Sequence, residues 1–406
     1  MKRKKRSLVV SDKTGVEEAE INEYYISCSR VFMTIKYVLL VILAIFVVVM
    51  LAVYRSSITY DNLAYLLRDF GTEYSSGAAV FSDLRYDEQE NMDFALYKGE
   101  LAVAGDKKIT LYNSASSKTF EYDSDMDNPV LECSDKYMLA YDLGGKNYSV
   151  FTNLTRVYNV QGDSVIENAS VSDSGEYLLI CRARDSKYTV SYYNSSFENE
   201  ANYYKSSYVS DASISPDGSM IAIASVGIKG NDFDSVIEFY KRGDENSISE
   251  YRAGNLLPVN TGTFKNGYFY VVCDKKILFF DDKGEYVSEY ISDRQKISAV
   301  SVYENTLTAV LSQNEVNDLS SIILFDNGGN IGYNIEIDCN VTDISHNDKY
   351  IYLLGAGKVF RCDYNTSGSI PEDVRCDVGV QYIIQDGDYV IAGDKTSAVG
   401  LFVNNG

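Results

Sequence analysis

The sequence is poor in several residue types on which catalytic and metal sites depend. Its 406 residues include no Trp, four Pro and a single His. A Ser-His-Asp triad or a His-rich metal site would have to use that one residue, His346, which stands in the polar stretch SHNDKY and is interpreted as a structural turn residue. The chain also lacks a CxxC pair, a GxSxG elbow, an HExxH motif and a phosphate-binding glycine loop. These absences favour a protein that is not an enzyme, and we predict no catalytic residue, cofactor or metal ligand.

Cysteine is scarce as well, with seven residues. Most of them stand within apolar runs, where a free thiol behaves as a small hydrophobic side chain. Cys362 and Cys376 flank the centre of one hairpin loop at similar distances, so the sequence leaves open a disulfide between them or two free thiols. Few Pro and 35 Tyr suit a protein made of many paired strands.

A charge-free apolar run covers residues 37–54 (YVLLVILAIFVVVMLAVY) and is long enough to cross a bilayer. A cleaved signal peptide is the competing interpretation. The run is long for that purpose, 36 residues precede it, and no A-x-A cleavage site follows it. We therefore predict a tail over residues 1–36 and one transmembrane helix over residues 37–54.

The distribution of charge predicts the orientation of this span. Residues 1–36 contain eight Lys/Arg, whereas the 36 residues after Val53 contain three. Basic residues stay on the cytoplasmic side, so we expect a cytoplasmic amino terminus in the plasma membrane and export of the remainder. That remainder holds 53 acidic and 29 basic residues. Such an acidic domain repels nucleic acid and is compatible with cations or basic partners.

One sequence phrase recurs eight times after the apolar run. Each copy has a polar turn, then a bulky residue, then a run of apolar residues, as in GEYLLICR (175–182) and GSMIAIAS (218–225). The copies are about 41 residues apart on average, which is the period of a four-stranded propeller blade. Their first apolar residues are Leu101, Tyr137, Tyr177, Met220, Tyr268, Thr306, Tyr350 and Tyr389. We predict an all-β chain forming an eight-bladed β-propeller, with seven blades as the alternative count.

The two ends of the repeat region complement each other. The last copy supplies three strands before the chain ends, and the missing fourth is predicted within residues 78–86, ahead of the first repeat. We therefore expect the propeller to cover residues 78–406. The segment between span and propeller, residues 55–77, is predicted to contain a short amphipathic helix at 58–71 followed by a linker.

The phrases SPDGSMIAIAS (215–225) and SDSGEYLLICRA (172–183) resemble WD40-like and TolB-like propeller repeats. In those families the phrase links the two inner strands of a blade, so the resemblance implies a fold and no particular partner. The layout of basic tail, single span, short helix and Tyr-rich propeller also resembles a bacterial domain-of-unknown-function family. That second resemblance implies a location in the cell envelope and no known activity.

Three unusual loops define a candidate binding face. They are DSDMDN (123–128), VGIKGNDFDS (226–235) and SQNEVNDLSS (312–321), and all should emerge on one side of the blades. The first begins like a calcium loop, but Asn128 and Ser134 stand where the turn Gly and the bidentate Glu belong, so a solvated loop is favoured. The carboxylates of this face are Asp123, Asp125, Asp127, Asp232, Asp234, Glu315 and Asp318.

A second candidate is aromatic, in the run SYYNSSFENEANYYKSSY (191–208). Adjacent tyrosines in a strand point to opposite faces, so one of each pair should be outward. Outward tyrosines are good anchors for peptides or glycans. The predicted patch consists of Tyr192, Tyr193, Tyr203 and Tyr204.

These features predict a non-catalytic binding, scaffold or sensor module at the cell envelope, integral to the membrane through one span. The expected partner is an envelope protein or a wall polymer. The alternative function is a carboxylate-dependent hydrolase of envelope glycans or peptides, because 53 acidic residues leave many carboxylate pairs open.

Overall fold

The structure is a computed structural model. It describes residues 23–53, 81, 84–184, 186–292, 295–313, 319–366, 370–374, 376, 379–386 and 389–402. The chain divides into two compact units, Met1–Thr72 and Glu73–Gly406, and each is described by itself.

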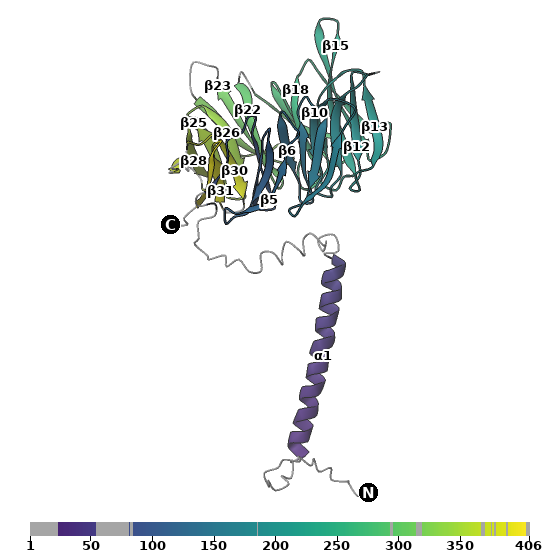
Figure 1. Ribbon diagram of the computed structural model, residues 1–406, viewed down its shortest axis with the longest axis vertical. Helices are drawn as coiled ribbons and strands as arrows, with labels where there is room; N and C mark the ends of the chain where they lie inside the picture. The colour runs from purple at the N-terminus through teal and green to yellow at the C-terminus, as the bar shows by residue number, and fades with distance from the viewer. Residues whose placement is uncertain are drawn as a thin grey trace. The chain divides into compact units, whose positions relative to one another are not determined.

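In its described residues, 23–53, the first unit forms one helix, α1 (Glu23–Val53), drawn in purple in Figure 1. Its segment Cys28–Val49 is long and apolar enough to cross a membrane. The helix begins well before the predicted boundary at residue 37, because the polar residues ahead of the apolar run continue the same helical turns. Tyr54 and the amphipathic helix predicted at 58–71 lie outside the described residues.

The second unit is an eight-bladed β-propeller, as predicted (Figure 1). Each blade is a four-stranded antiparallel sheet. Blade 1 comprises β2 (Asp93–Tyr97), β3 (Glu100–Ala104), β4 (Lys108–Tyr112) and β5 (Lys118–Asp123). Blade 2 comprises β6 (Pro129–Cys133), β7 (Met138–Asp142), β8 (Asn147–Phe151) and β9 (Arg156–Gln161). Blade 3 comprises β10 (Ile166–Val171), β11 (Tyr177–Arg182), β12 (Tyr188–Tyr193) and β13 (Asn199–Lys205). Blade 4 comprises β14 (Tyr208–Ile214), β15 (Met220–Lys229), β16 (Asp232–Lys241) and β17 (Ser249–Gly254).

The remaining blades follow the same order. Blade 5 comprises β18 (Pro258–Thr263), β19 (Phe269–Cys273), β20 (Lys276–Phe280) and β21 (Tyr286–Ile291). Blade 6 comprises β22 (Gln295–Tyr303), β23 (Thr306–Gln313), β24 (Leu319–Asp326) and β25 (Ile331–Asp338). Blade 7 comprises β26 (Val341–His346), β27 (Tyr350–Gly355), β28 (Lys358–Asp363) and β29 (Glu372–Val374). Blade 8 comprises β30 (Tyr382–Asp386), β31 (Tyr389–Gly393), β32 (Ser397–Phe402) and β1 (Leu84–Arg85).

The recurring phrase forms the second strand of every blade and the turn before it. In blades 3 and 4 this turn contains Gly175 and Gly218, whose φ angles are 94° and 70°. Side chains other than hydrogen are strained at such angles, which explains the glycine in each phrase. The apolar residues that follow are buried on both faces because a neighbouring blade packs on each side.

Blade 8 is built from both ends of the propeller chain. Its strand order is β1-β32-β31-β30, and Leu84 lies opposite Ala398 in an antiparallel ladder. This pairing confirms that a strand within 78–86 completes the last blade. The closed ring leaves no blade without its fourth strand.

The propeller has two faces that differ in their connections. Contacts between the first strands of neighbouring blades, such as β14 with β18, place these strands nearest the axis. Because strands alternate in direction, second-to-third strand turns and the connections between blades lie on one face. We call this the hairpin face, since the β15–β16 hairpin projects from it at the top of Figure 1.

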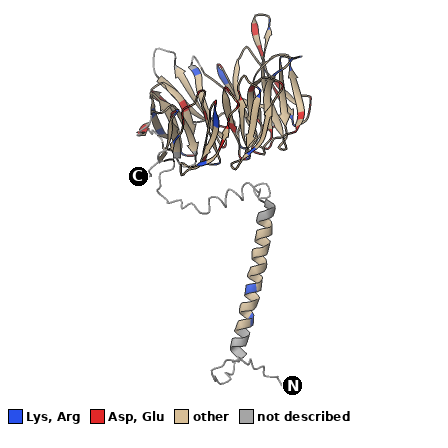
Figure 2. Cartoon of the chain, in the orientation of Figure 1, with Lys and Arg blue, Asp and Glu red and all other residues tan. Residues whose placement is uncertain are grey.

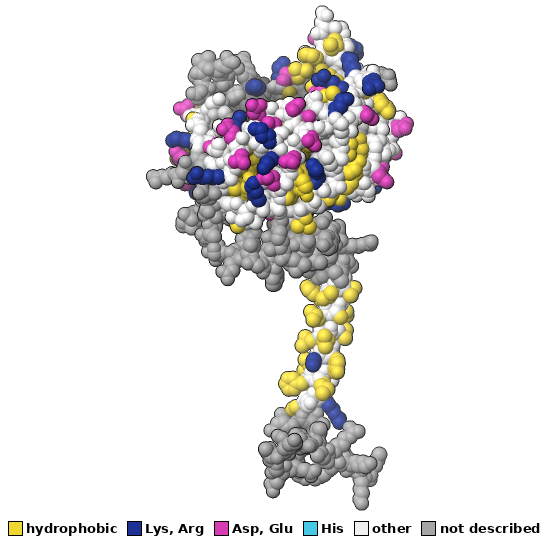
Figure 3. Space-filling model, viewed as in Figure 1, with side chains coloured by type: hydrophobic (Ala, Val, Ile, Leu, Met, Phe, Trp, Pro, Cys, Tyr) yellow, Lys and Arg dark blue, Asp and Glu magenta, His cyan; other side chains and the backbone are white. Residues whose placement is uncertain are grey.

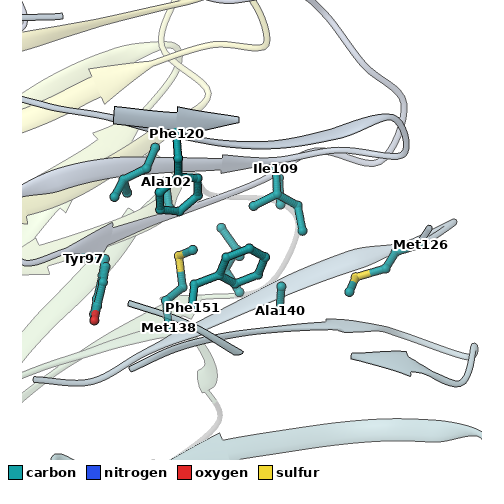
Figure 4. Close-up of a cluster of buried hydrophobic side chains, with 11 residues drawn as sticks. Tyr97, Ala102, Ile109, Phe120, Met126, Met138, Ala140 and Phe151 are labelled. Carbon is teal, nitrogen blue, oxygen red and sulfur yellow. The ribbon is translucent and has the colours of Figure 1, made fainter. Parts of the chain in front are cut away.

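The core consists of apolar clusters between successive blades. Figure 4 shows the cluster between blades 1 and 2, where Phe120 and Phe151 stack with ring centroids 5.6 Å apart. Tyr97, Met126 and Met138 complete the packing on either side. Such flat, interdigitated contacts fix each blade against the next and make the ring a rigid scaffold.

Residues 226–235 are not the long loop that the sequence predicted. They continue β15 and β16 as an uninterrupted antiparallel ladder up to Lys229 and Asp232. The turn between them is Gly230–Asn231, and Gly230 has a φ of 68°, as the first central residue of a type II′ hairpin turn requires. Glycine and aspartate in this stretch suggested a loop, although they belong to a projecting two-stranded ribbon.

Cys362 and Cys376 are not bonded to each other. Cys362 is buried in the cluster between blades 6 and 7, whereas Cys376 packs against the cluster between blades 7 and 8. The two sulfurs face different interblade cores, and the disulfide that the sequence left open does not form.

Candidate binding face

The structure places five of the seven predicted carboxylates on the hairpin face, in two separate groups. Asp123, Asp125 and Asp127 lie in or beside the connection between blades 1 and 2. Asp232 and Asp234 lie in β16 of blade 4. Because whole blades separate the groups, the structure brings the first three together but does not join them to the second pair. Glu315 and Asp318 lie outside the described residues.

The loop that carries the first group is held firmly. The backbone N–H groups of Asp127 and Asn128 donate to Oδ1 of Asp142, at 3.0 and 2.8 Å. Nδ2 of Asn91 donates to the carbonyl oxygen of Asp127 at 3.1 Å, and Met126 is buried in the core below. The loop is therefore set in position before any ligand arrives.

A polar pocket of about 240 Å³ lies beside this loop. Its lining includes Asp123, Asp125, Asn147, Arg156 and Gln161. The guanidinium of Arg156 lies 5.0 Å from the ring centroid of Tyr122, a cation–π contact that leaves its N–H groups available as donors. The pocket can offer hydrogen-bond acceptors and donors to a small polar group. No set of three His, Cys, Asp or Glu side chains in the described part of the chain is arranged to hold a metal ion.

The carboxylates of the hairpin are partly neutralised by basic neighbours. Asp234 lies 3.7 Å from Arg252, and Lys229 is the register partner of Asp232. In Figure 2, positions of acidic and basic residues are intermixed along the ribbon of the propeller. The described residues therefore do not form a single negative patch across the whole hairpin face.

The predicted tyrosine patch is mostly interior. Tyr192 and Tyr203 are buried, and Tyr193 is half-buried with its ring stacked on Tyr177 at 4.8 Å. Tyr204 is 71% exposed, so the outward member predicted for its pair is found there. The sequence could not show that Tyr192 and Tyr203 face blade 4, where they fill the interblade cluster.

Tyr204 lines the larger pocket of the hairpin face, about 640 Å³ in volume. Asp163 and Ser164 line it from the connection between blades 2 and 3, and Arg184 and Ser186 from the β11–β12 turn. Among the predicted tyrosines, Tyr204 is thus the one available to a partner.

Carboxylates of the inner strands form a set of clamps between blades that the sequence did not reveal. Asp93, Asp211 and Asp343 accept hydrogen bonds from backbone N–H groups of the next blade: Leu131 at 2.7 Å, Thr261 at 2.6 Å and Ile383 at 3.0 Å. Burial raises the pKa of all three carboxyls, and that of Asp211 to about 6, although the hydrogen bonds partly oppose this shift. These carboxylates join neighbouring blades, and their oxygens already accept hydrogen bonds from backbone N–H groups.

Glu132, in the inner strand of blade 2, differs from these clamps. Burial is the main cause that raises its pKa to about 8, and the charges of Asp211 and Asp93 add to it. Because those two residues belong to blades 4 and 1, the Glu132 carboxyl faces the propeller axis. With a pKa of about 8 this carboxyl is mostly protonated at neutral pH and adds little negative charge beside the axis.

His346 is structural, as expected, but it ends strand β26 and does not lie in a turn. It is 1% exposed. Its Nε2 lies 3.0 Å from Oγ1 of Thr306 and its Nδ1 lies 3.1 Å from Oγ of Ser301, both in blade 6. Burial lowers its pKa to about 4, so the ring is neutral and joins blades 6 and 7.

The fold defines a class, the eight-bladed β-propellers. Among solved structures the chain is similar to BamB from Moraxella catarrhalis, with a TM-score of 0.55 and 11% identity over 80% of this chain and 99% of that one. It is also similar to Sqt1 from Chaetomium thermophilum, solved with the N-terminus of ribosomal protein L10, with a TM-score of 0.56 and 13% identity over 80% and 99%. The computationally designed Ika8 protein gives a TM-score of 0.56 and 11% identity over 80% and 100%.

Within this class the chain belongs to the family of unknown function DUF5711, which matches residues 72–400. That range covers the propeller up to its last strand, β32, which ends at Phe402. No curated protein sequence matches the chain. The likeness to solved structures, at 11–13% identity, establishes the fold alone.

Proposed function

We propose that this protein is a membrane-anchored, extracytoplasmic binding module that uses the hairpin face of its propeller to hold an envelope protein or a wall polymer. The observation that carries the proposal is the contrast between a rigid ring and the features on this face. A firmly held acidic loop, two pockets and a projecting hairpin all occur there. Rigid scaffolds with elaborated loops are typical of binding proteins.

The proposed location rests on α1 and on the charges around it. The segment Cys28–Val49 is long enough to span a bilayer, and the eight basic residues of positions 1–36 favour a cytoplasmic amino terminus. The proposed domain limits are a tail over 1–36, a span over 37–54, a connecting segment over 55–77 and a propeller over 78–406.

One propeller of similar fold supports a role in binding. Sqt1 was solved bound to the N-terminus of ribosomal protein L10, so a protein with a fold similar to this one can hold a polypeptide. In the present chain Asp93, Asp211 and Asp343 already accept hydrogen bonds from backbone groups, and the sole histidine is buried between blades. These features favour binding over hydrolysis.

Protease added to intact, wall-stripped cells tests the topology. We expect digestion of the propeller and protection of the amino-terminal tail, followed with one epitope tag at each end of the chain. A propeller that resists protease until the membrane is permeabilised would contradict the proposed orientation.

The binding role is tested separately, by crosslinking the full-length chain in cells from positions on each face. Gln161 and Tyr204 report on the hairpin face, and Lys283 reports on the opposite one. We expect adducts with an envelope protein or wall polymer from the hairpin face in preference. Equal labelling from both faces would contradict the proposal, as would hydrolysis of purified wall polymer by the protein.

A further inference from the structure

The projecting part of the β15–β16 hairpin has two chemically different faces. Ile228 and Phe233 are direct register partners and are 79% and 44% exposed. Lys229 pairs with Asp232, and Gly227 pairs with Asp234, on the other side of the ribbon. Side chains alternate between the faces of a sheet, so one face of this ribbon is apolar and the other is charged.

The apolar face continues a packing surface that blade 5 covers lower down. Met220, Ala222 and Ala224 of β15 pack in one cluster with Phe269 and Val271 of blade 5. The β15–β16 register has no irregularity, so Ile228 and Phe233 point to that same side. Strands β19 and β20, which provide the cover, meet at a turn after Cys273, and the described strands of blade 5 do not reach as far as Ile228.

The top of blade 5 forms a floor beside this apolar wall. Val259, at the beginning of β18, is 60% exposed. The side chain of Lys275, in the β19–β20 turn, is 71% exposed, and its carboxylate neighbour Asp274 lies 3.8 Å away. The backbone N–H of Phe233 donates to Oδ1 of Asn255 at 3.3 Å, which ties the wall to the connection between blades 4 and 5. Figure 3 shows hydrophobic side chains along the hairpin and beside its base.

We propose that this ledge, formed by Ile228, Phe233, Val259 and Lys275, docks an extended segment of another protein. The segment carries apolar side chains at alternate positions and a carboxylate that pairs with Lys275. Continuity argues for this occupant, because the same face of blade 4 packs against β-strands of blade 5 directly below. The inference rests on the proposed function and names the surface and the partner chemistry.

Two other occupants fit the chain less well. Beyond residue 36 it has 53 acidic and 29 basic residues, so two copies repel each other and an anionic lipid surface repels the propeller. Asp232 also stands at the ribbon tip, where insertion into a bilayer would bury its charge. Both remain distinguishable outcomes of the experiment below.

The first test compares the two faces of the ribbon by photo-crosslinking. One photo-crosslinking residue at a time is introduced into the full-length chain, which is kept in its own membrane. The apolar positions are Ile228 and Phe233, and the matched controls are their immediate neighbours Lys229 and Asp232. We expect one and the same protein, identified by mass spectrometry, to be crosslinked from both apolar positions and not from the controls. Equal adducts from both faces, adducts with lipid or a second copy alone, or no adduct would overturn the proposal.

Affinity measurements on the purified full-length chain and the identified protein give the second test. We expect the double substitution Ile228→Ser with Phe233→Ser to raise the dissociation constant about tenfold or more, as loss of a central apolar anchor does. Lys229→Ser with Asp232→Ser should change it less than about threefold. Both pairs are exposed, so unchanged circular dichroism and melting are expected. Equal weakening by both pairs, or by neither, would overturn the proposal.

Crosslinkers at Gln161 and Tyr204, elsewhere on the hairpin face, separate this inference from the proposed function. Adducts there without adducts at Ile228 and Phe233 would reject the ledge and leave the binding module intact. Loss of adducts at every one of these positions would reject both.

Discussion

Asp211 in the inner strand of blade 4 accepts a hydrogen bond from the backbone N–H of Thr261 in blade 5, at 2.6 Å. The same carboxylate also accepts from the N–H of Ala212 and from Nδ2 of Asn168 in blade 3, each at 2.8 Å. One side chain thus joins three consecutive blades beside the axis. Asp93 and Asp343 repeat the contact to the following blade at two other points of the ring.

We expect Asp211→Ala to lower the free energy of unfolding by at least about 2 kcal/mol, because two buried backbone donors and the partly buried amide of Asn168 lose their acceptor. Denaturant titration of the full-length chain in detergent measures the effect. Asp163→Ala, at an exposed position, is the control and should stay within about 0.5 kcal/mol of the parent. A similar, small effect of both substitutions would show that the clamp contributes nothing.

Glu132 should make the propeller less stable as pH rises. Its pKa in the folded chain is about 8, against 4.5 for an unburied glutamate, so folding favours the protonated form. Its contribution is full below pH 4.5 and is lost as pH rises through 8. We expect Glu132→Gln to exceed the parent in stability by on the order of 1–3 kcal/mol at pH 9 and to match it near pH 4.5.

Unfolding midpoints across this pH range check the prediction. Glu88→Gln, at an exposed position, should follow the parent at every pH. A Glu132→Gln curve parallel to that of the parent would contradict the predicted protonation of Glu132.

His346 should titrate far below the ordinary range for histidine. Burial between blades 6 and 7 lowers its pKa to about 4, from 6.5. Its contribution to stability is therefore complete above pH 6.5 and is lost as pH falls through 4. The chain has one histidine, so NMR of histidine-labelled protein reports this residue without assignment. A midpoint near 6.5 would show that the ring is open to water.

Closure of the ring by β1 should depend on Leu84. This side chain is 2% exposed in the cluster between blades 8 and 1, whereas its neighbour Arg85 is exposed. We expect Leu84→Ala to lower the free energy of unfolding by about 2–4 kcal/mol, because it leaves a cavity in a packed core. Arg85→Ala should cost less than about 1 kcal/mol. Equal effects would mean that the strand does not hold the ring closed.

The sequence was sufficient to predict the blades because their signal is local. A polar turn followed by a buried apolar strand, as around Gly175 and Gly218, is readable from neighbouring residues alone. The fourth strand of the last blade, which contains Leu84, could be predicted because the last repeat supplies only three of the four strands that a blade needs.

The candidate site was harder to predict because its determinants are not local. Asp211 accepts a hydrogen bond from Thr261, which belongs to a different blade. Tyr192 and Tyr203 are buried by strands of the next blade. The stretch around Gly230 has the composition of a loop, and its ladder depends on the pairing of Ile228 with Phe233. The ledge beside it exists because blade 5 has shorter strands than blade 4, a comparison that needs the assembled ring.

The pairing of β1 with β32 also determines when the ring can close during synthesis of the chain. The ribosome makes Leu84 near the start of the propeller and Ala398 near its end, so the ladder between them forms only after nearly all of the chain has been synthesised. Until then the ring is open, and the edges of the first and last blades are exposed to wrong pairings. A chain cut short by a late stop codon before β32 therefore lacks the partner of β1. We expect quality-control proteases to degrade such a chain, because its ring cannot close.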